Sequence, residues 1–382
     1  MIKSIKLKHF LINVVFRPMN IINKIIYKKK NKILFYCPLK SFTDNSKYLY
    51  DYLIENNYNT RYKIYIGINK PKQHNYPSVN VKVIGKVMTI FHYLTSSYVF
   101  YCYGKIPIKT TNKQCVINLW HGTPLKKIGK MLPQIDNEQF YFSYILAASD
   151  AFVDIMSRSF GCPAENVLIC GQARNDILLS SENKYTFLCS NLILWLPTFR
   201  KSGILELYDS DCEDLIPLIK QEEYEELNKK LHELNIILFI KLHHAQDLEM
   251  YNITELSNLY VYSQDDFERY GYDLYILLSQ ANALISDYSS VYFDFLLLDR
   301  PIAFTIDDIE SYDSKRGFVF NNPEKYMPGP KIKTKEELYK FISDVINNND
   351  KYAEFRREVN DFANKYKDNN NRKRILKIAR IE

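Results

Sequence analysis

The sequence is poor in cysteine, glycine and proline. Its 382 residues include seven cysteines, which are scattered, and none of them forms a C-x-x-C pair. An odd number of scattered cysteines is not typical of a disulfide framework, so we expect reduced thiols in a cytoplasmic compartment. There are 11 glycines and 14 prolines and no visible internal repeat, which argues against a repeat array.

Acidic residues are missing from the start of the chain. No Asp or Glu occurs before Asp44, whereas nine Lys or Arg lie within residues 1–32. Apolar residues recur at helical spacing in this segment, with a break near Pro18. The apolar run is too short to span a bilayer, and no signal-peptide cleavage site follows it. We interpret residues 1–32 as an amphipathic segment that associates with an anionic membrane surface; the alternative is a solvated helix packed on its domain.

Several nucleotide-binding motifs are also missing. No G-x-G-x-x-G occurs, and six residues instead of four separate Gly122 from Gly129, with Met131 in place of the Ser or Thr of a P-loop. Residues 209–211 form a D-x-D, as in metal-dependent glycosyltransferases, but no strand precedes them, so we predict neither a metal site nor a cofactor. The tyrosines are too evenly spread to form a platform for nucleic acid, and we expect no nucleic-acid partner.

Short apolar strands alternate with helical segments along the rest of the chain. The hydrophobic content of 46% allows sizeable cores, and the length exceeds what one core usually supports. The pattern predicts strands at 33–37, 62–66, 79–84, 98–103, 115–119, 144–147 and 167–170, then at 192–196, 236–241, 259–262, 283–286 and 302–305. Such alternation is typical of parallel sheets that helices cover on both faces.

These elements predict an α/β chain with two Rossmann-like domains whose parallel sheets face a cleft. We place the N-terminal domain at 33–180 and the C-terminal domain at 186–348, because a polar segment without strand pattern separates them. Helical patterning over 349–382 indicates a terminal element that packs back across both domains. In such folds ligands bind at the carboxyl ends of the strands.

The stretch from Trp120 to Lys127 reads as strand, tight turn and helix start. Thr123 suits the N-cap and Pro124 the first helical position. The free amides of that turn, with Lys126, would face an anion. His121 on the turn then suggests proton transfer near a phosphate. The alternative is a core histidine between a strand and a helix.

Three loops after predicted strands of the second half carry phosphate-binding chemistry. Arg200 follows one strand and suits a bidentate phosphate contact, and His243 follows another. Ser289 or Ser290 follows a third strand and suits the N-cap of an apolar helix. Their joint occurrence predicts a pyrophosphate cradle, although each residue alone has a structural interpretation. We assign no role to His244, because adjacent side chains of a strand point to opposite faces.

Ordered blocks between about residue 115 and 345 resemble the CDP-glycerol glycerophosphotransferases of teichoic acid and capsule synthesis. The blocks are Trp120-His121-Gly122-Thr123-Pro124-Leu125-Lys126, Gly171-x-x-Arg174-Asn175-Asp176, Pro197-Thr198-Phe199-Arg200, Lys241-Leu242-His243, Asp273-Leu274-Tyr275, Ser286-Asp287-Tyr288-Ser289-Ser290, Arg300-Pro301, Arg316-Gly317-Phe318 and Pro328-Gly329-Pro330. Residues 1–110 resemble the family only in general pattern. Ala173 departs from it, because proline is frequent there.

The resemblance implies a GT-B fold with the acceptor domain first and the nucleotide domain second. It implies transfer of glycerol phosphate from CDP-glycerol to a hydroxyl of an acceptor linked to undecaprenyl diphosphate, with release of CMP, by a primase or a polymerase at the cytoplasmic face of the cell membrane. His121 and His243 correspond to the functionally important histidines of the family. Substrate-binding positions are expected at Gly122, Thr123, Lys126, Arg174, Pro197, Thr198, Arg200, Asp287, Ser289, Ser290 and Arg316.

In the mechanism that follows, His121 takes the acceptor's proton and the second domain holds the diphosphate. Asp176 and Asp287 are candidates for orienting histidines. Three alternatives stay open: a CDP-ribitol donor, a GT-B glycosyltransferase that uses a nucleotide sugar, and a non-enzymatic binding protein with a degenerate cleft. The presence of His121, Arg200 and His243 argues against the last.

Overall fold

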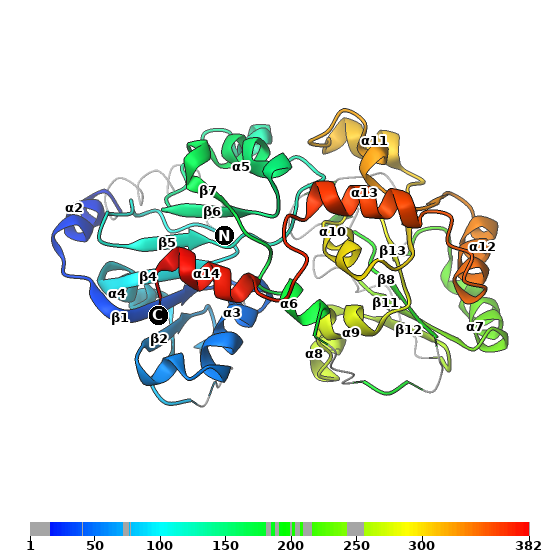
Figure 1. Ribbon diagram of the computed structural model, residues 1–382, viewed down its shortest axis with the longest axis horizontal. Helices are drawn as coiled ribbons and strands as arrows, with labels where there is room; N and C mark the ends of the chain where they lie inside the picture. The colour runs from blue at the N-terminus through cyan, green and yellow to red at the C-terminus, as the bar shows by residue number, and fades with distance from the viewer. Residues whose placement is uncertain are drawn as a thin grey trace. The chain divides into compact units, whose positions relative to one another are not determined.

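The computed structural model describes residues 16–39, 41–71, 76, 78–180, 185–187, 191–198, 201–202, 207–208, 216–242 and 256–381. The chain forms two compact units (Figure 1). Unit 1 contains the chain up to His121, then Gly129–Asp176 and the residues from Asn370 onward, and unit 2 contains Gly122–Ile128 and Ile177–Asn369. The change of unit after Asp176 falls shortly before residues 180–185, the polar segment between the two predicted domains.

Unit 1 is built on a seven-stranded sheet in the order β3-β2-β1-β4-β5-β6-β7, and every pairing in it is parallel. The strands are β1 (Lys29–Tyr36), β2 (Lys63–Gly67), β3 (Val81–Ile84), β4 (Ser96–Tyr101), β5 (Cys115–Asn118), β6 (Tyr144–Ala147) and β7 (Val167–Ile169). Its helices are α2 (Arg17–Ile25), α3 (Asp44–Glu55), α4 (Lys86–Thr95), α5 (Val153–Phe160) and α14 (Asn371–Ala379), and α6 (Asn175–Leu178) lies at the change of unit.

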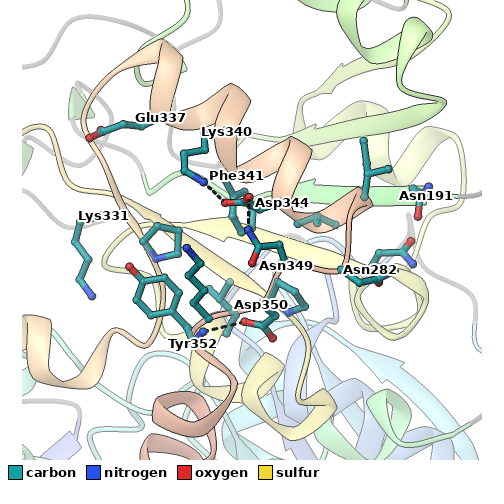
Figure 2. Close-up of a pocket in the computed structure, with 17 residues that line it drawn as sticks. Asn191, Asn282, Lys331, Glu337, Lys340, Phe341, Asp344, Asn349, Asp350 and Tyr352 are labelled. Carbon is teal, nitrogen blue, oxygen red and sulfur yellow. Dashed lines mark hydrogen bonds and ion pairs between the residues drawn. The ribbon is translucent and has the colours of Figure 1, made fainter.

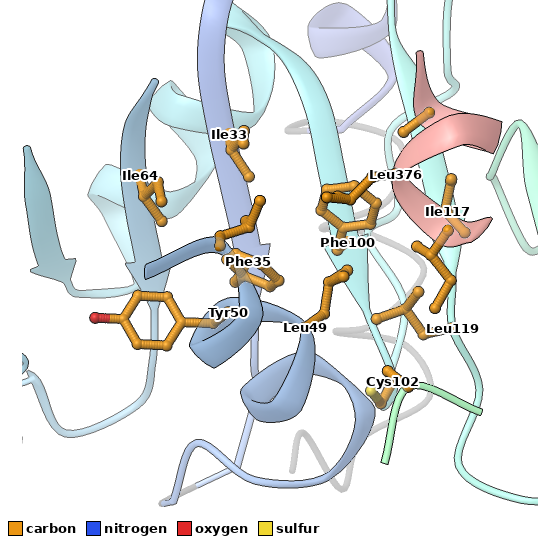
Figure 3. Close-up of a cluster of buried hydrophobic side chains, with 14 of the residues drawn as sticks. Ile33, Phe35, Leu49, Tyr50, Ile64, Phe100, Cys102, Ile117, Leu119 and Leu376 are labelled. Atoms are coloured by element: carbon orange, nitrogen blue, oxygen red, sulfur yellow. The ribbon is translucent and has the colours of Figure 1, made fainter. Parts of the chain in front are cut away.

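The core of unit 1 lies between its sheet and two helices from opposite ends of the chain (Figure 3). Phe35 of β1 and Phe100 of β4 are fully buried and their rings lie 5.5 Å apart. Leu49 of α3 and Leu376 of α14 pack against them in the same cluster. Burial of these apolar faces is the main force that holds α3 and α14 on the sheet.

Two contacts fix the start of α14. Both carboxylate oxygens of Asp176 accept hydrogen bonds of 2.9 Å, from the main-chain amides of Asn371 and Arg372. Gly171 lies so close that a Cβ at this position would stand 2.3 Å from Oδ1 of Asn371. Asp176 therefore anchors α14. The prediction that it orients a histidine is wrong, because its carboxylate oxygens bond to α14 instead.

Unit 2 has a six-stranded parallel sheet in the order β12-β11-β8-β13-β14-β15. The strands are β8 (Asn191–Trp195), β11 (Ile236–Lys241), β12 (Leu259–Tyr262), β13 (Ala283–Ser286), β14 (Ile302–Thr305) and β15 (Lys331–Ile332), beside a short antiparallel pair of β9 (Lys201–Ser202) and β10 (Leu207–Tyr208). The helices are α7 (Tyr224–Glu233), α8 (Gln264–Arg269), α9 (Leu274–Gln280), α10 (Val291–Phe295), α11 (Ile309–Lys315), α12 (Lys335–Ile346) and α13 (Ala353–Ala363).

Local signals explain where helices of unit 2 begin. The Asp273 side chain accepts from two amides of the first turn of α9, and Thr334 forms a capping box with Glu337 at α12. Arg356 of α13 is only 2% exposed and pairs with Asp299 and Asp350, which holds α13 on this unit. The terminal element of the prediction thus consists of two helices, α13 in unit 2 and α14 in unit 1.

The predicted parallel sheets are confirmed. The structure adds β15, α8 and α11, which the apolar pattern does not indicate. The prediction of a helix after Thr123 is wrong, because residues 122–128 contain no helical turn.

Candidate functional site

Each unit has a point in its sheet where the order of strands reverses direction. In unit 1 this point lies between β1 and β4, and in unit 2 between β8 and β13. Chain segments leave these two neighbouring strands toward opposite sides, which opens space for a ligand at their carboxyl ends. The residues that follow β1, β4, β8 and β13 are therefore the first candidates for function.

His121 follows β5, the neighbour of β4, and a hydrogen bond and an aromatic contact hold its ring. Its Nδ1 lies 3.1 Å from the main-chain oxygen of Cys102. A carbonyl only accepts, so this bond places the proton of the neutral imidazole on Nδ1 and the lone pair on Nε2. The ring stacks on Tyr103 with the ring centroids 4.5 Å apart and the planes at 19°. A histidine with this tautomer can accept a proton through Nε2.

Behind His121 lies a buried ion pair. Nη1 of Arg174 donates to Oδ1 of Asp44 at 2.7 Å and to the main-chain oxygen of His121 at 3.2 Å. Burial alone would raise the pKa of the Asp44 carboxyl, but the Arg174 charge and the Tyr103 hydroxyl hold that pKa below its ordinary value. Asp44 is thus a carboxylate at neutral pH, and Arg174, which is 5% exposed, has its charge directed at it.

The segment after His121 takes a different course from the predicted helix. Gly122 has a φ of 140°, which favours glycine, and the chain then pairs with residues of unit 2. The Lys127 amide donates to the oxygen of Gly317 at 3.0 Å, and the Val319 amide donates to the oxygen of Leu125 at 2.9 Å. These backbone bonds replace the helical ones. Thr123 consequently caps no helix, and the anion site expected from helix amides beside His121 is absent from this described stretch.

Lys126 instead lies beside an aromatic group of unit 2. Its Nζ is 5.9 Å from the centroid of the Tyr312 ring. Tyr312 packs against Tyr288 at 4.3 Å and against Phe318 at 5.8 Å. Arg316 ends α11 one turn after Tyr312, and its Nε is buried without a hydrogen-bond partner among the described residues. Lys126 and Arg316 therefore bring positive charge to the neighbourhood of the loop that carries Ser289 and Ser290.

The loops after β8 and β13 are joined through Asp287. This carboxylate is fully buried and accepts from the amide and the hydroxyl of Thr198 and from the amide of Ser289. Ser290 occupies the N-cap position of α10, but no side-chain cap bond forms. The predicted N-cap position of Ser290 is therefore confirmed, although its side chain does not bond to the first turn of α10. Both serines are half-buried at the switch point of this sheet.

The structure thus groups the predicted residues in two sets. In unit 1 it brings together His121 and Arg174, and in unit 2 Pro197, Thr198, Asp287, Ser289 and Ser290 follow neighbouring strands, with Lys126 and Arg316 around Tyr312. Arg200, His243 and the D-x-D at 209–211 lie outside the described residues. Sequence reasoning missed Asp44 and Tyr103; both follow strands at the switch point of unit 1, so the sheet order is the signal that finds them.

A pocket of about 760 Å³ lies at the amino ends of the strands of the unit 2 sheet (Figure 2). Asn191 begins β8 there, and Asn282 and Pro301 directly precede β13 and β14. Among its charged lining residues, Lys340 pairs with Asp344 at 2.6 Å. This pocket faces the amino ends of the strands, away from Thr198, Asp287 and Ser289, and is not the candidate site.

Comparison with known proteins identifies the family. The model of the CDP-glycerol:poly(glycerophosphate) glycerophosphotransferases matches residues 18–379. The chain belongs to this family. It is 26% identical over 365 residues to the teichoic acid glycerol-phosphate transferase of Staphylococcus aureus (strain NCTC 8325 / PS 47), covering 87% of this chain and 89% of that protein.

Two further relatives set the limits of the likeness. Identity to the teichoic acid poly(glycerol phosphate) polymerase of Bacillus subtilis (strain 168) is 27% over 331 residues, 80% of this chain but 42% of the polymerase. The chain therefore spans less than half the length of that relative. A structure of the wall teichoic acid polymerase TagF superimposes with a TM-score of 0.74 at 22% identity, covering 98% of this chain and 96% of that one. The expected GT-B-like fold and the glycerophosphotransferase class are thereby confirmed.

Proposed function

We propose that this glycerophosphotransferase moves glycerol phosphate from CDP-glycerol to a hydroxyl of a lipid-linked acceptor and releases CMP. The observation that carries the proposal is the imidazole of His121, whose Nδ1–H is committed to the Cys102 carbonyl at 3.1 Å so that Nε2 presents a lone pair. The full family match over residues 18–379 supplies the donor class. Relatives named for teichoic acid synthesis support the setting.

In the proposed reaction, Nε2 of His121 takes the proton of the acceptor hydroxyl as its oxygen attacks the glycerol-bearing phosphorus. A new P–O bond forms, and the bond from that phosphorus to the oxygen of CMP breaks. The electron pair leaves with CMP, whose phosphate gains one negative charge. General-base help of this kind typically contributes ~10²–10⁴-fold, and positioning and charge stabilisation supply much of the rest.

We assign donor binding to unit 2. Lys126 and Arg316 supply positive charge, and Ser289 and Ser290 supply hydroxyls for the diphosphate oxygens. Asp287 does not face the donor's charge directly; it holds the loops after β8 and β13 in place. The predicted roles of Arg200 and His243 as further phosphate ligands belong to the same proposal.

We further propose that unit 1 rests on the anionic cytoplasmic face of the membrane. Within the described ranges, no helix combines the length and apolar character needed to cross a bilayer. However, α2 exposes Ile21, Ile22 and Ile25, which are 65%, 43% and 77% accessible. Basic residues flank them, including exposed Lys24. Apolar side chains beside lysines are typical of interfacial binding.

A second group of exposed apolar residues lies on α4. Val87, Met88 and Phe91 are exposed on this helix at the same i, i+1, i+4 spacing as the isoleucines of α2. Lys28 ties the two helices together, since its Nζ donates to the main-chain oxygens of Asn23 and of Leu94, at 2.8 and 2.5 Å. Both helices therefore contribute to the surface that we propose for membrane binding.

One assay separates the proposed donor from its rivals. The purified chain is incubated with an acceptor disaccharide on undecaprenyl diphosphate and, separately, with CDP-glycerol, CDP-ribitol or UDP-N-acetylglucosamine. Release of CMP with CDP-glycerol in excess over the other two donors is the expected result. Preferred turnover of CDP-ribitol would make the chain a ribitol phosphotransferase, and release of UDP would replace the proposal with a glycosyltransferase.

A further inference from the structure

We propose that Tyr103 and Asp44 are positioning residues that hold the imidazole of His121 for proton transfer. The inference rests on the proposed role of His121 as the base. It gives a function to two residues that lie outside the family blocks around residues 120 and 174, and it gives Arg174 a supporting task. All four residues belong to unit 1.

The ring of His121 contacts two neighbouring aromatic rings. Tyr103 stacks on it with a centroid distance of 4.5 Å, and the Trp120 ring lies 3.8 Å away at 40°. The bond from Nδ1 to the Cys102 oxygen limits rotation of the imidazole. The direction of Nε2 thus depends on where the Tyr103 ring stands.

The position of Tyr103 is in turn set by Asp44. The Tyr103 hydroxyl donates to Oδ2 of Asp44. Burial, together with the Asp44 charge, raises the pKa of Tyr103 well above its ordinary value, so the phenol keeps the proton that this bond requires. The contact joins a buried phenol to a buried carboxylate, where a hydrogen bond is strong because little water competes.

Arg174 connects Asp44 back to the backbone of His121. Its Nη1 binds Oδ1 of Asp44 at 2.7 Å and the main-chain oxygen of His121 at 3.2 Å. The path runs from the imidazole to Tyr103, from Tyr103 to Asp44, and through Arg174 back to the backbone of His121. Ring and backbone of the same histidine are therefore fixed by one set of charges.

Backbone conformation at two positions shows how tightly this region is specified. Asp44 has a φ of 61° and Trp120 a φ of 56°, in the left-handed region that bulky residues seldom occupy. Asn45, next to Asp44, bonds to both of the other segments. Its Nδ2 donates to the Trp120 oxygen at 3.0 Å, and its Oδ1 accepts from the Arg174 amide at 3.1 Å. A core histidine with only a packing role would not require this framework.

The charges have the sign that a base needs. When Nε2 accepts a proton, the resulting imidazolium is attracted by the Asp44 carboxylate, with which His121 interacts electrostatically. Replacement of Asp44 by Asn removes this attraction and leaves the Arg174 charge without its partner. Both changes disfavour the imidazolium, so the acidic limb of the pH–rate profile should move to lower pH.

The decisive test compares two tyrosine variants. Tyr103→Phe keeps the stacked ring and removes the hydroxyl that reaches Asp44. Tyr93→Phe is the matched control, because Tyr93 is a fully buried tyrosine of the same unit whose hydroxyl donates to the Ile108 oxygen at 3.0 Å. For each variant, kcat, the KM for CDP-glycerol and the melting temperature are measured with the full chain.

We expect Tyr103→Phe to lower kcat about 10-fold, a part of the ~10²–10⁴-fold that general-base help typically contributes. Its KM should stay within about 3-fold, since the base acts in the transition state and not in ground-state donor binding. Its melting temperature should match that of Tyr93→Phe. A kcat within about 2-fold of Tyr93→Phe would overturn the inference, because a structural role alone predicts equal effects.

Two further variants keep the outcome interpretable. Tyr103→Leu, which also loses the stacked ring, should be slower than Tyr103→Phe, and Asp44→Asn should shift the acidic limb of the pH–rate profile downward by a measurable amount. An unshifted limb in folded Asp44→Asn would contradict the electrostatic part. If His121→Ala keeps wild-type turnover, the proposed base itself fails; if only Tyr103→Phe is silent, the base stands and the positioning inference fails.

Discussion

The carboxylate of Asp287 accepts a hydrogen bond of 2.6 Å from the main-chain amide of Thr198, although 89 residues separate the two positions. The Ser289 amide donates to the same carboxylate at 3.1 Å. One buried charge therefore sets the spacing of the loops that follow β8 and β13. Any ligand bound at this switch point depends on that spacing.

Replacement of Asp287 by Asn should weaken donor binding. The new side-chain NH₂ would confront an amide donor, and leaving such a buried donor unpaired costs roughly 1–3 kcal/mol. We expect CDP-glycerol affinity, measured by calorimetry, to fall about 10-fold. Asp294→Asn is the control, because Asp294 is equally buried and accepts from the Tyr275 hydroxyl on α9. Unchanged affinity in a folded Asp287→Asn variant would show that the loops do not carry the donor.

Arg316→Ala should also weaken donor binding, through lost charge instead of lost loop structure. The buried Nε of Arg316 lacks a protein partner among the described residues, and a phosphate oxygen would supply a charge-assisted bond. Lys315→Ala changes an exposed cation one residue away and serves as the control. Equal donor affinity of the two variants would remove Arg316 from the proposed cradle.

His121→Ala should abolish transfer while leaving donor affinity within about 3-fold, because a base acts in the transition state and contributes little to ground-state binding. His92→Ala tests the alternative of a core histidine. His92 is 6% exposed and packs on the Tyr65 ring at 3.7 Å, so its loss should lower stability and spare kcat. A loss of donor affinity in His121→Ala would make this residue a phosphate ligand instead.

The apolar faces of α2 and α4 should carry membrane binding. Burial of one large apolar side chain contributes roughly 1.5–3 kcal/mol, so the pairs Ile21→Ser with Ile25→Ser and Val87→Ser with Phe91→Ser should each reduce co-sedimentation with anionic liposomes at least ~10-fold. Leu234→Ser with Tyr270→Ser removes exposed apolar residues of unit 2 and should have no effect. If all three pairs sediment alike, another surface binds the membrane.

His92 should make the fold sensitive to acid. Burial and the nearby Lys32 charge lower the pKa of His92 to about 4, below its ordinary value of 6.5. Between these values the unfolded chain binds more protons, so stability falls as the pH drops from about 6.5 to about 4. Across this pH window, the denaturant concentration at the unfolding midpoint should decrease less in His92→Phe than in the wild type. His232→Phe, at an exposed position, should follow the wild type. Parallel pH curves for His92→Phe and the wild type would contradict this assignment.

Secondary structure and fold class follow from local pattern in most of this chain. The strands β8, β11, β13 and β14 are short apolar runs buried on both faces, and α9, which precedes β13, carries its own cap at Asp273. These signals lie within a few residues of each element. They are therefore readable without knowledge of the tertiary structure.

The helix expected at Thr123 and Pro124 failed for a reason that no local pattern contains. Leu125 bonds to Val319 and Lys127 to Gly317, almost 200 positions further along the chain. Tertiary backbone pairing here overrides a weak preference for a helix start. His121 itself was correctly singled out as the residue on the turn.

Asp44 and Tyr103 were missed because their relation depends on sheet order. They follow β1 and β4, which are neighbours in space, whereas β2 and β3 come between these strands in sequence. The residues became visible as a group only when the crossover in the sheet was known. A search restricted to the carboxyl ends of strands at such reversals would have included both.

The anchorage of α14 sets an order in which the protein can be completed during synthesis. Asp176 lies 195 residues before its partner Asn371, and the larger segment of unit 2, from Ile177 to Asn369, is translated in between. The sheet that precedes His121 therefore leaves the ribosome while the apolar surface that Leu376 later covers is still exposed. The helix α14 can pack against unit 1 only after residues 177–369 have been translated.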